Sequence, residues 1–296
     1  MKRFIAAFGL AILLSLPAYS QNKVILCLRS GNMGPYNDAV NGFKKELNAK
    51  NVEYQFLDFG ADYRHDPDNI RPDIVLAVGS KALEIAVQQF KGSNIVFMMV
   101  VNPKSQLSSV KGITLDIPPE RAFKTLKRIL PQTRKIAVMY NPLQTKDLVA
   151  ESISRAESAG IEMIPVKVKG SEDVYGAVRS IIGKVDALWM IPDSSIYNSD
   201  TSQDVLLVSL REKLPVIGLS PMYVKAGALF ALSCDYADIG SQAADLAINI
   251  LNNTIPSNFS FAPPRKDVIS VNLITAERIG VKIPDSLLKE AANVYK

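Results

Sequence analysis

The sequence predicts an α/β protein with doubly wound parallel sheets. Short strand-like runs alternate with amphipathic segments along almost the whole chain. Most of these runs are apolar at consecutive positions, which indicates strands that are covered on both faces. A rough internal repeat favours two sheets over one wide sheet, because RPDIVLAVGSKALE and NIVFMMVVNPKSQ are echoed by KVDALWMIPDSSIY and LPVIGLSPMYVKAG.

The expected elements follow one another in a regular order. Each strand is rich in Val, Ile, Leu or aromatic residues, and the strands are expected at 23–28, 53–59, 73–79, 94–100, 112–117, 135–140, 161–168, 186–191, 215–219 and 228–234. Each helix carries apolar residues at helical spacing, and the helices are expected near 36–49, 81–91, 119–130, 145–159, 171–183, 201–213, 237–252 and 284–294. A chain of 296 residues that is 48% hydrophobic can bury one large core or two of ordinary size.

Residues 1–20 predict a secretory signal peptide. Lys2 and Arg3 precede an apolar run, and the small residues that follow favour cleavage after Ser20. Gln21 stands where a lipoprotein would carry cysteine, so no lipid anchor is expected. No later run is long and apolar enough to span a bilayer, and the mature chain is expected to be soluble and exported to the periplasm.

Charge and composition argue against several classes of function. Removal of Lys2 and Arg3 lowers the formal charge from +5 to +3, which is too small and too scattered to favour nucleic acid. His65 is the single histidine, which argues against a Ser-His-Asp triad or a His-rich zinc site, and no cluster has the spacing of metal ligands. Cys27 and Cys234 lie in apolar runs and are expected to be buried free thiols.

Ligand contacts are expected in the turns that follow the strands. In open parallel sheets the ligand crevice lies beyond the carboxyl ends of the strands. These turns are rich in Ser, Asn, Asp and Tyr and lie at 29–36, 79–80, 102–103, 141–145, 192–197 and 220–223. Such a lining is typical of a site for a small polar or zwitterionic molecule, and it lacks the nucleophile and base that catalysis requires. The sequence therefore favours a binding protein that uses no cofactor over an enzyme.

Gly79 and Ser80 form the best-defined of these turns. Ser80 is expected at the N-cap of the following helix, where unpaired backbone N–H groups suit a carboxylate or a polar head group. A phosphate-binding loop is excluded because Ile74 stands where its first glycine is needed, and a dinucleotide motif would need two more glycines. Simple capping by Ser80 remains the alternative.

The second half of the chain carries a family resemblance. From Lys135 onward, the segments KIAVMYNP, KVDALWMIPDSS, GALFALSCDYADIGSQAADLAINIL and VISVNLITAERIGVKIPDSLL resemble, in order and spacing, ABC transporter substrate-binding proteins of the type I periplasmic-binding fold. The branch resembled includes tryptophan- and tyrosine-type receptors, and the resemblance covers nearly the whole mature chain. It implies two lobes joined by a three-strand hinge, with crossings near 116–119, 234–237 and 262–267. Lobe 1 is then expected at 21–116 plus 237–262, and lobe 2 at 119–234 plus 267–296.

Some segments depart from the family pattern. The stretch 59–73 is too short and proline-rich for the usual helix. Asn102 stands where the family often has aspartate, and NPLQTKD at 141–147 differs from the usual turn. The identity of the ligand is therefore not carried over from the family.

The candidate residues of the second lobe lie at equivalent turns. Asn141 and Thr145, which is expected to open helix 145–159, are placed to close on the same head group, with capping as the alternative for Thr145. Asp193, beside Ser194, is expected to pair with a ligand ammonium, and its alternative is again a cap. Asp235 is expected to anchor a crossing or to touch the ligand.

Aromatic residues complete the candidate site. Tyr36, Tyr197 and Tyr223 lie at strand-end turns, where an aromatic wall with a polar tip suits a flat or apolar side group, although each taken alone is typical of a surface rim. Asn102 and Ser220 are further candidate contacts at such turns.

The resemblance implies a monomeric receptor that captures a small solute and delivers it to a membrane ABC permease. An amino acid or a related carboxylate is the expected ligand, held between lobes that close by a hinge. Two alternatives stay open: the sensing subunit of a signalling receptor, and an exported hydrolase with a pair of site carboxylates about 5–10 Å apart.

Overall fold

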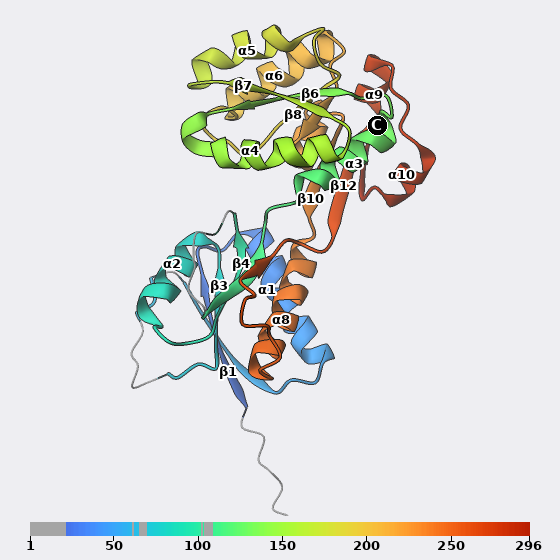
Figure 1. Cartoon of the computed structure of the whole chain (residues 1–296). Coiled ribbons are helices and arrows are strands. Elements are labelled where there is room, and N and C mark those ends of the chain that lie inside the picture. Colours follow the sequence, from blue (N-terminus) through green and yellow to red (C-terminus); the bar gives the residue numbers. More distant parts are fainter. Residues whose placement is uncertain (1–21, 61, 65–69, 102, 104–108) are drawn as a thin grey trace, which may run out of the picture.

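The computed structural model describes residues 22–60, 62–64, 70–101, 103 and 109–296. The expected signal peptide, His65 and Asn102 lie outside the described residues. Among the residues described, no helix combines the length and the apolar character that a membrane span requires. The C-terminus lies in the body that carries the second sheet (Figure 1).

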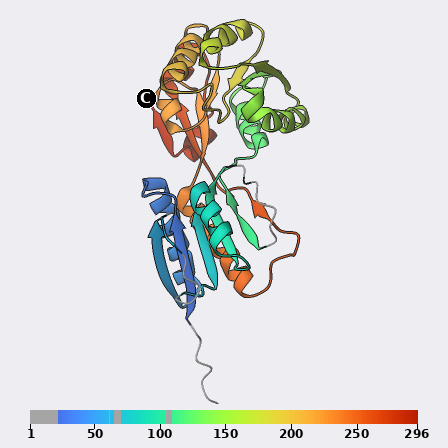
Figure 2. The ribbon, with the colours of Figure 1, turned by 90° about the vertical axis from the view of Figure 1, so that its left-hand side faces the viewer.

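Two separate sheets organise the chain, and each is the centre of one lobe, as Figures 1 and 2 show from perpendicular directions. The sheet of lobe 1 has the order β11-β5-β4-β3-β1-β2 and that of lobe 2 the order β13-β12-β10-β9-β8-β6-β7. The first sheet consists of β1 (Lys23–Arg29), β2 (Tyr54–Gly60), β3 (Ile74–Val78), β4 (Ile95–Val100), β5 (Val110–Thr114) and β11 (Phe261–Ala262). The second consists of β6 (Lys135–Tyr140), β7 (Glu162–Lys167), β8 (Ala187–Trp189), β9 (Val216–Gly218), β10 (Phe230–Cys234), β12 (Asp267–Asn272) and β13 (Asn293–Tyr295).

Helices cover both faces of the lobe 1 sheet. Ile25 and Cys27 of β1 face α1 (Gly34–Ala49) and α8 (Tyr236–Leu251), while Leu26 and Leu28 face α2 (Ser80–Gln89). Because every residue from Ile25 to Leu28 is buried, the strand has no polar face, as the continuous apolar run predicts.

Helices α1 and α8 approach each other backbone to backbone. A Cβ atom on Gly42 would lie 1.9 Å from the carbonyl oxygen of Ala237, and a Cβ on Gly240 would lie 1.8 Å from that of Ala39. Only glycine fits at these two positions, so a pair of glycines distant in sequence sets the packing of α8 onto lobe 1.

The lobe 2 sheet is also covered on both faces. Ile136 and Val138 of β6 face one set of helices, and Ala137 and Met139 face the other. The first set is α3 (Pro119–Ile129), α4 (Pro142–Ser158), α9 (Leu273–Ile279) and α10 (Asp285–Glu290). The second is α5 (Val174–Ile181), preceded by the 3-10 turn η1 (Ser171–Asp173), with α6 (Ser199–Arg211) and α7 (Pro221–Lys225). The prediction of an α/β protein with two doubly wound lobes is confirmed.

Several details of the C-terminal part differ from the sequence prediction. Strand β12 runs antiparallel to β10, although parallel strands are expected throughout. The helix expected at 284–294 ends at Glu290, and 293–295 instead form strand β13 beside β12. Strand β12 has no counterpart among the expected elements, and neither have β11, α7 and α9, which are too short to carry a clear periodic pattern.

The described chain passes between the lobes three times, at 115–118, at 235 and at 263–266 (Figure 1). Strands β5 and β10 each end where a crossing begins, and they run parallel to their neighbours β4 and β9. The carboxyl ends of the parallel strands in both sheets therefore lie at the edges that face the crossings.

The crossings are tied to one another by hydrogen bonds. The thiol of Cys234 donates to the carbonyl oxygen of Leu115 at 3.5 Å. The guanidinium of Arg121 donates to the carbonyl oxygen of Pro264 and to the carboxylate of Asp267, both at 2.8 Å. Two of the crossings are thus bonded to residues that flank another crossing, Leu115 to the end of β10 and Pro264 to the start of α3.

Candidate functional site

The two sheets present equivalent turns toward the crossings. Counted outward from the crossing strand, lobe 1 has β4, β3 and β1, and lobe 2 has β9, β8 and β6. The turn after β3 therefore corresponds in position to the turn after β8, and the turn after β1 to the turn after β6. This matches the internal repeat in the sequence, which aligns the β3 and β4 segments with the β8 and β9 segments.

Two backbone donors at the N-terminus of α2 have no partner within the described part of the chain. Gly79 is the N-cap, with φ of 90°, and Ser80 is the first helical residue, with an exposed side chain that makes no capping bond. The expectation that Ser80 caps this helix is wrong. The hydroxyl oxygen of Ser30 accepts from the backbone N–H of Ala82 at 2.9 Å instead. The backbone N–H groups of Ser80 and Lys81 have no partner among the residues described.

Ser30, Tyr36 and Gly79 come together beside these donors. A Cβ atom on Gly79 would lie 2.6 Å from the hydroxyl oxygen of Ser30 and 2.7 Å from that of Tyr36. The sequence prediction included Tyr36 and Gly79 but missed Ser30. The available signal was its place directly after a buried strand, in the turn 29–36.

Asp193 is the centre of the corresponding turn in lobe 2. Its side chain is buried, and its carboxylate accepts four hydrogen bonds. One oxygen accepts from the backbone N–H of Asn141 at 3.0 Å and from the hydroxyl of Thr145 at 2.7 Å. The other accepts from the backbone N–H of Ser195 at 3.2 Å and from its hydroxyl at 2.6 Å. The four bonds use the normal accepting capacity of a carboxylate, so Asp193 ties the turn after β8 to the turn after β6.

The hydrogen bonds to Asp193 also govern its ionisation. Burial raises the pKa of the Asp193 carboxyl, but the bonds from Ser195, Asn141 and Thr145 outweigh burial and bring the pKa below its ordinary value. The carboxylate is therefore ionised at neutral pH, and the hydrogen bonds from protein donors stabilise its charge.

Asn141 and Thr145 belong to the same network. The side-chain oxygen of Asn141 caps α4 by accepting from the backbone N–H of Leu143 at 3.0 Å, and its amide donates to the carbonyl oxygen of Lys169 and to the hydroxyl of Ser195, both at 3.1 Å. Helix α4 begins at Pro142, three residues before the predicted start, and a kink at Thr145 separates this first turn from the helix expected at 145–159. Thr145 lies inside the helix at a local departure from helical geometry, with φ of −128°. Ligand contact by Asn141 or Thr145 stays a prediction.

The remaining candidates of lobe 2 have different surroundings. Tyr197 is buried in the core with its hydroxyl unpartnered among the described residues, and burial, with Asp193 and Tyr223 nearby, raises its pKa. Tyr223 is half-buried, and its hydroxyl lies 3.3 Å from that of Ser202. Ser194 is exposed and Ser220 half-buried, and neither side chain has a hydrogen-bond partner within the part of the chain described, so both hydroxyls are available to a ligand.

The residues next to the crossing have structural partners. Asp235 is the N-cap of α8 and accepts from the backbone N–H of Asp238 at 3.0 Å. Asp238 is buried and pairs with Arg265 at 3.0 Å and with Lys266 at 2.9 Å. This geometry fits the anchoring role considered for Asp235. Cys27 and Cys234 are free, and burial raises the pKa of both thiols, that of Cys234 to about 12.

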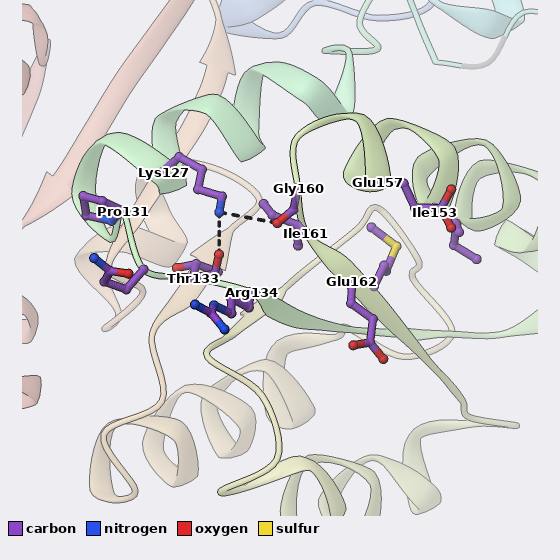
Figure 3. Close-up of a pocket in the computed structure, with 11 residues that line it drawn as sticks. Lys127, Pro131, Thr133, Arg134, Ile153, Glu157, Gly160, Ile161 and Glu162 are labelled. Atoms are coloured by element: carbon purple, nitrogen blue, oxygen red, sulfur yellow. Dashed lines mark hydrogen bonds between the residues drawn. The ribbon is translucent and has the colours of Figure 1, made fainter.

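A surface hollow lies elsewhere on lobe 2. It has a volume of about 550 Å³ and is lined by residues of α3, α4, the loop 131–134 that precedes β6, and the amino-terminal end of β7 (Figure 3). In it the amino group of Lys127 donates to the carbonyl oxygens of Thr133 and Gly160. Because the hollow lies at the amino-terminal edge of the sheet, it is not part of the candidate site. Within the described ranges, no group of three or more His, Cys, Asp or Glu residues is arranged to hold a metal ion.

The family is decided by a comparison of the whole chain. Residues 38–295 match the family model described as ABC transporter substrate binding protein. The chain belongs to this family. Substrate-binding proteins of ABC transporters are solute-binding proteins and are generally extracytoplasmic.

The chain is also similar to individual members of the family. It is 25% identical over 192 residues to a tyrosine-binding protein of Clostridioides difficile (strain R20291), and the match covers 61% of this chain and 55% of the relative, so that it spans little more than half of that protein. A ligand-free, open structure of a substrate binding protein with adhesive properties from Clostridium difficile gives a TM-score of 0.75 at 20% identity, over 93% of this chain and 99% of that one. The structure of an ABC domain from Streptococcus pneumonia in complex with L-Trp gives a TM-score of 0.61 at 18% identity, over 93% of this chain and 100% of that one. These two likenesses show the fold.

Proposed function

We propose that this substrate-binding protein is an exported monomer that captures an amino acid or a related carboxylate between its lobes and delivers it to a membrane ABC permease, without transforming it. The observation that carries the proposal is the orientation of both sheets, whose carboxyl ends face the same crossings. A ligand placed there would touch turns of both lobes, and hinge closure would enclose it. The matched tyrosine-binding relative supports an amino-acid ligand.

The carboxylate of the ligand is assigned to the turn after β3. The backbone N–H groups of Ser80 and Lys81, which no described residue accepts from, are donors at a helix N-terminus, where the helix dipole adds about 0.3–1 kcal/mol in favour of an anion. The hydroxyl oxygen of Ser30 accepts from the N–H of Ala82, and its hydrogen can still be donated to a ligand. The hydroxyl of Tyr36, which lies beside Gly79, is a further donor. A carboxylate therefore has up to four donors, two from the turn after β3 and two from the turn after β1.

The opposite side of the ligand is assigned to the turns after β8 and β9. Ser194, Ser220 and Tyr223 offer hydroxyls there, and the Asp193 carboxylate fixes the first of these turns. Direct contact between Asp193 and a ligand ammonium would require one of its four donors to give way. Asn102, Asn141, Thr145, Tyr197 and Asp235 remain proposed neighbours of the ligand.

A thermal-shift screen of the mature protein against the amino acids and small organic acids tests the proposal. A ligand at 100 times its Kd raises the free energy of unfolding by about 2.7 kcal/mol, so a match is readily seen. Ser30→Ala is expected to lower the affinity for the best ligand of the screen about tenfold. Ser93 lies outside these turns, so Ser93→Ala is expected to leave this affinity unchanged. If no member of the two groups raises the melting temperature, the proposed ligand class is wrong.

A further inference from the structure

Large apolar side chains are exposed on the edges that face the crossings. Leu143 is 91% exposed and Met33 is 53% exposed. Leu143 is the second residue of α4, directly after β6, and Met33 is the N-cap of α1, after β1. Both therefore lie at the carboxyl ends of parallel strands, one in each lobe.

The backbone around Leu143 holds its side chain away from its own lobe. The N–H of Leu143 donates to the side-chain oxygen of Asn141 at 3.0 Å, and Asn141 is itself held by Lys169, Ser195 and Asp193. Because this turn is fixed by so many bonds, Leu143 cannot fold back onto the core without breaking the cap of α4.

Strand order places Met33 and Leu143 at equivalent positions. Counted from the crossing strands, β1 is the third neighbour in lobe 1 and β6 is the third neighbour in lobe 2. Between them and the crossings lies the polar pair of turns around Ser80 and Asp193. A contact between Met33 and Leu143 would therefore close the side of the site opposite to the hinge.

A second pair of exposed residues shows the same relation nearer the hinge. Val101 follows β4 and is 51% exposed, and Met222 follows β9 and is 68% exposed. Strands β4 and β9 are again at equivalent positions in the two sheets. Apolar pairs thus flank the polar turns on both sides, which is the arrangement needed to exclude water from a bound polar group.

We propose that Met33 and Leu143 pack against each other when the lobes close, forming an apolar contact at the mouth of the site. The inference rests on the proposed function, because it needs a closed state. Closure would bury two side chains that are exposed in the present arrangement, and this burial favours the closed state. The partner that covers each of these exposed side chains is thus the opposite lobe of the same chain.

Cross-linking tests the contact directly. In a Met33→Cys, Leu143→Cys double variant, mild oxidation is expected to form an intramolecular disulfide, since closure would bring the two positions within the distance that a disulfide allows. Peptide mapping by mass spectrometry identifies the bond. The native thiols do not compete, because Cys27 is buried and Cys234 has a raised pKa.

A Met33→Cys, Leu207→Cys variant is the matched control. Leu207 is also an exposed leucine of lobe 2, at 47%, but lies in the middle of α6 and not at a strand-end turn. The proposal predicts at least a tenfold higher yield for the pair 33 and 143, rising further when a ligand from the screen is added. Equal yields in the two variants overturn it, whether or not a ligand is found.

Serine substitutions separate this contact from the proposed function. Met33→Ser and Leu143→Ser are each expected to lower the affinity for an amino-acid ligand found by the screen about tenfold. Leu207→Ser is expected to leave this affinity unchanged. Unchanged binding in both variants would contradict the closure contact and leave the receptor function standing. A disulfide in the double variant, together with a screen that finds no ligand, would support the contact and overturn the proposed function.

Discussion

Gly79 and Asp193 occupy equivalent strand-end turns, yet they serve these turns in opposite ways. Gly79 leaves space, because its missing side chain lets Ser30 and Tyr36 approach the N-terminus of α2. Asp193 fills space, because its buried carboxylate takes four hydrogen bonds from two neighbouring turns. One turn therefore keeps free donors for a ligand, and the other is held rigid by donors that the protein supplies.

Gly79→Ala is expected to abolish the donor arrangement of the first turn. The new Cβ would lie 2.6 Å from the Ser30 hydroxyl, and the residue would keep φ of 90° and ψ of 164° at a cost of about 1–3 kcal/mol. Isothermal titration with the best amino-acid ligand should show a loss of affinity of at least tenfold. Gly92→Ala is the control, since Gly92 has a φ of 83° with no atom near its Cβ position, and it should bind normally.

Asp193→Asn is expected to lower the free energy of unfolding by about 2–3 kcal/mol at pH 7, because an amide cannot accept all four bonds and leaves buried donors unpaired. The folded pKa of Asp193 lies below its unfolded value, so its contribution is fully present above the unfolded value of about 4 and is lost as the pH falls through the folded pKa.

Urea unfolding from pH 7 down to pH 3 checks both parts of this expectation. The difference in stability between the native protein and Asp193→Asn should shrink below pH 4. A difference that stays constant over this range would show that the charge of Asp193 does not contribute.

At the scale of helices and strands, packing depends on two glycines that no local pattern reveals. Gly42 and Gly240 lie about 200 residues apart, and each faces the backbone of the other helix. Their role follows only from the approach of α8 to α1, which the sequence alone does not give.

Gly240→Ala is expected to destabilise lobe 1 by about 3 kcal/mol, because its Cβ would lie 1.8 Å from the carbonyl oxygen of Ala39 and the helices must move apart. Gly176→Ala in α5 is the matched control, since no atom lies within 4 Å of its Cβ position, and it should be neutral or stabilising by up to about 1 kcal/mol. Chemical denaturation of the two variants measures the difference, and equal stabilities would refute the close approach.

The strands in apolar runs up to β10 could be predicted from the sequence, including the three-residue strands β8 and β9, whereas the C-terminal strands β12 and β13 could not. Strand β6 is found at its predicted bounds because the buried apolar run from Ile136 to Tyr140 stands between the polar residues Lys135 and Asn141. Strand β13 was predicted as helix because its three residues are decided by pairing with β12 and not by local preference.

The sequence predicted which turns form the candidate site, but not which hydrogen bonds their residues make. The turn at Asp193 was identified, but the four donors that surround the carboxylate come from residues up to 52 positions away and follow from the fold. Ser30 was missed because its partner, the N–H of Ala82, is likewise 52 positions away.

At the scale of the whole molecule, the lobes have separate cores and share the crossings. The third crossing is held to lobe 1 by Arg265, which pairs with Asp238 and Asp245, both at 3.0 Å, and to lobe 2 by the bond between Arg121 and Asp267. Relative movement of the lobes is therefore expected to concentrate in the few residues between these two anchors.

Calorimetry should show this separation. Without ligand, the van't Hoff enthalpy of unfolding is expected to be smaller than the calorimetric enthalpy, because the two cores need not melt together. A saturating amino-acid ligand should bring the two enthalpies closer, since it couples the lobes. Equal enthalpies in the absence of ligand would indicate that the crossings alone make the molecule a single cooperative unit.

The position of α8 in the sequence has a consequence for biosynthesis. This helix covers α1, yet it is made only after the strands from β6 to β10 of the other lobe. Lobe 2 in turn needs β12, α9 and α10, which come later still. A chain that ended near Cys234 would therefore lack part of both lobes, and neither lobe has all of its core segments until the last of them has been synthesised.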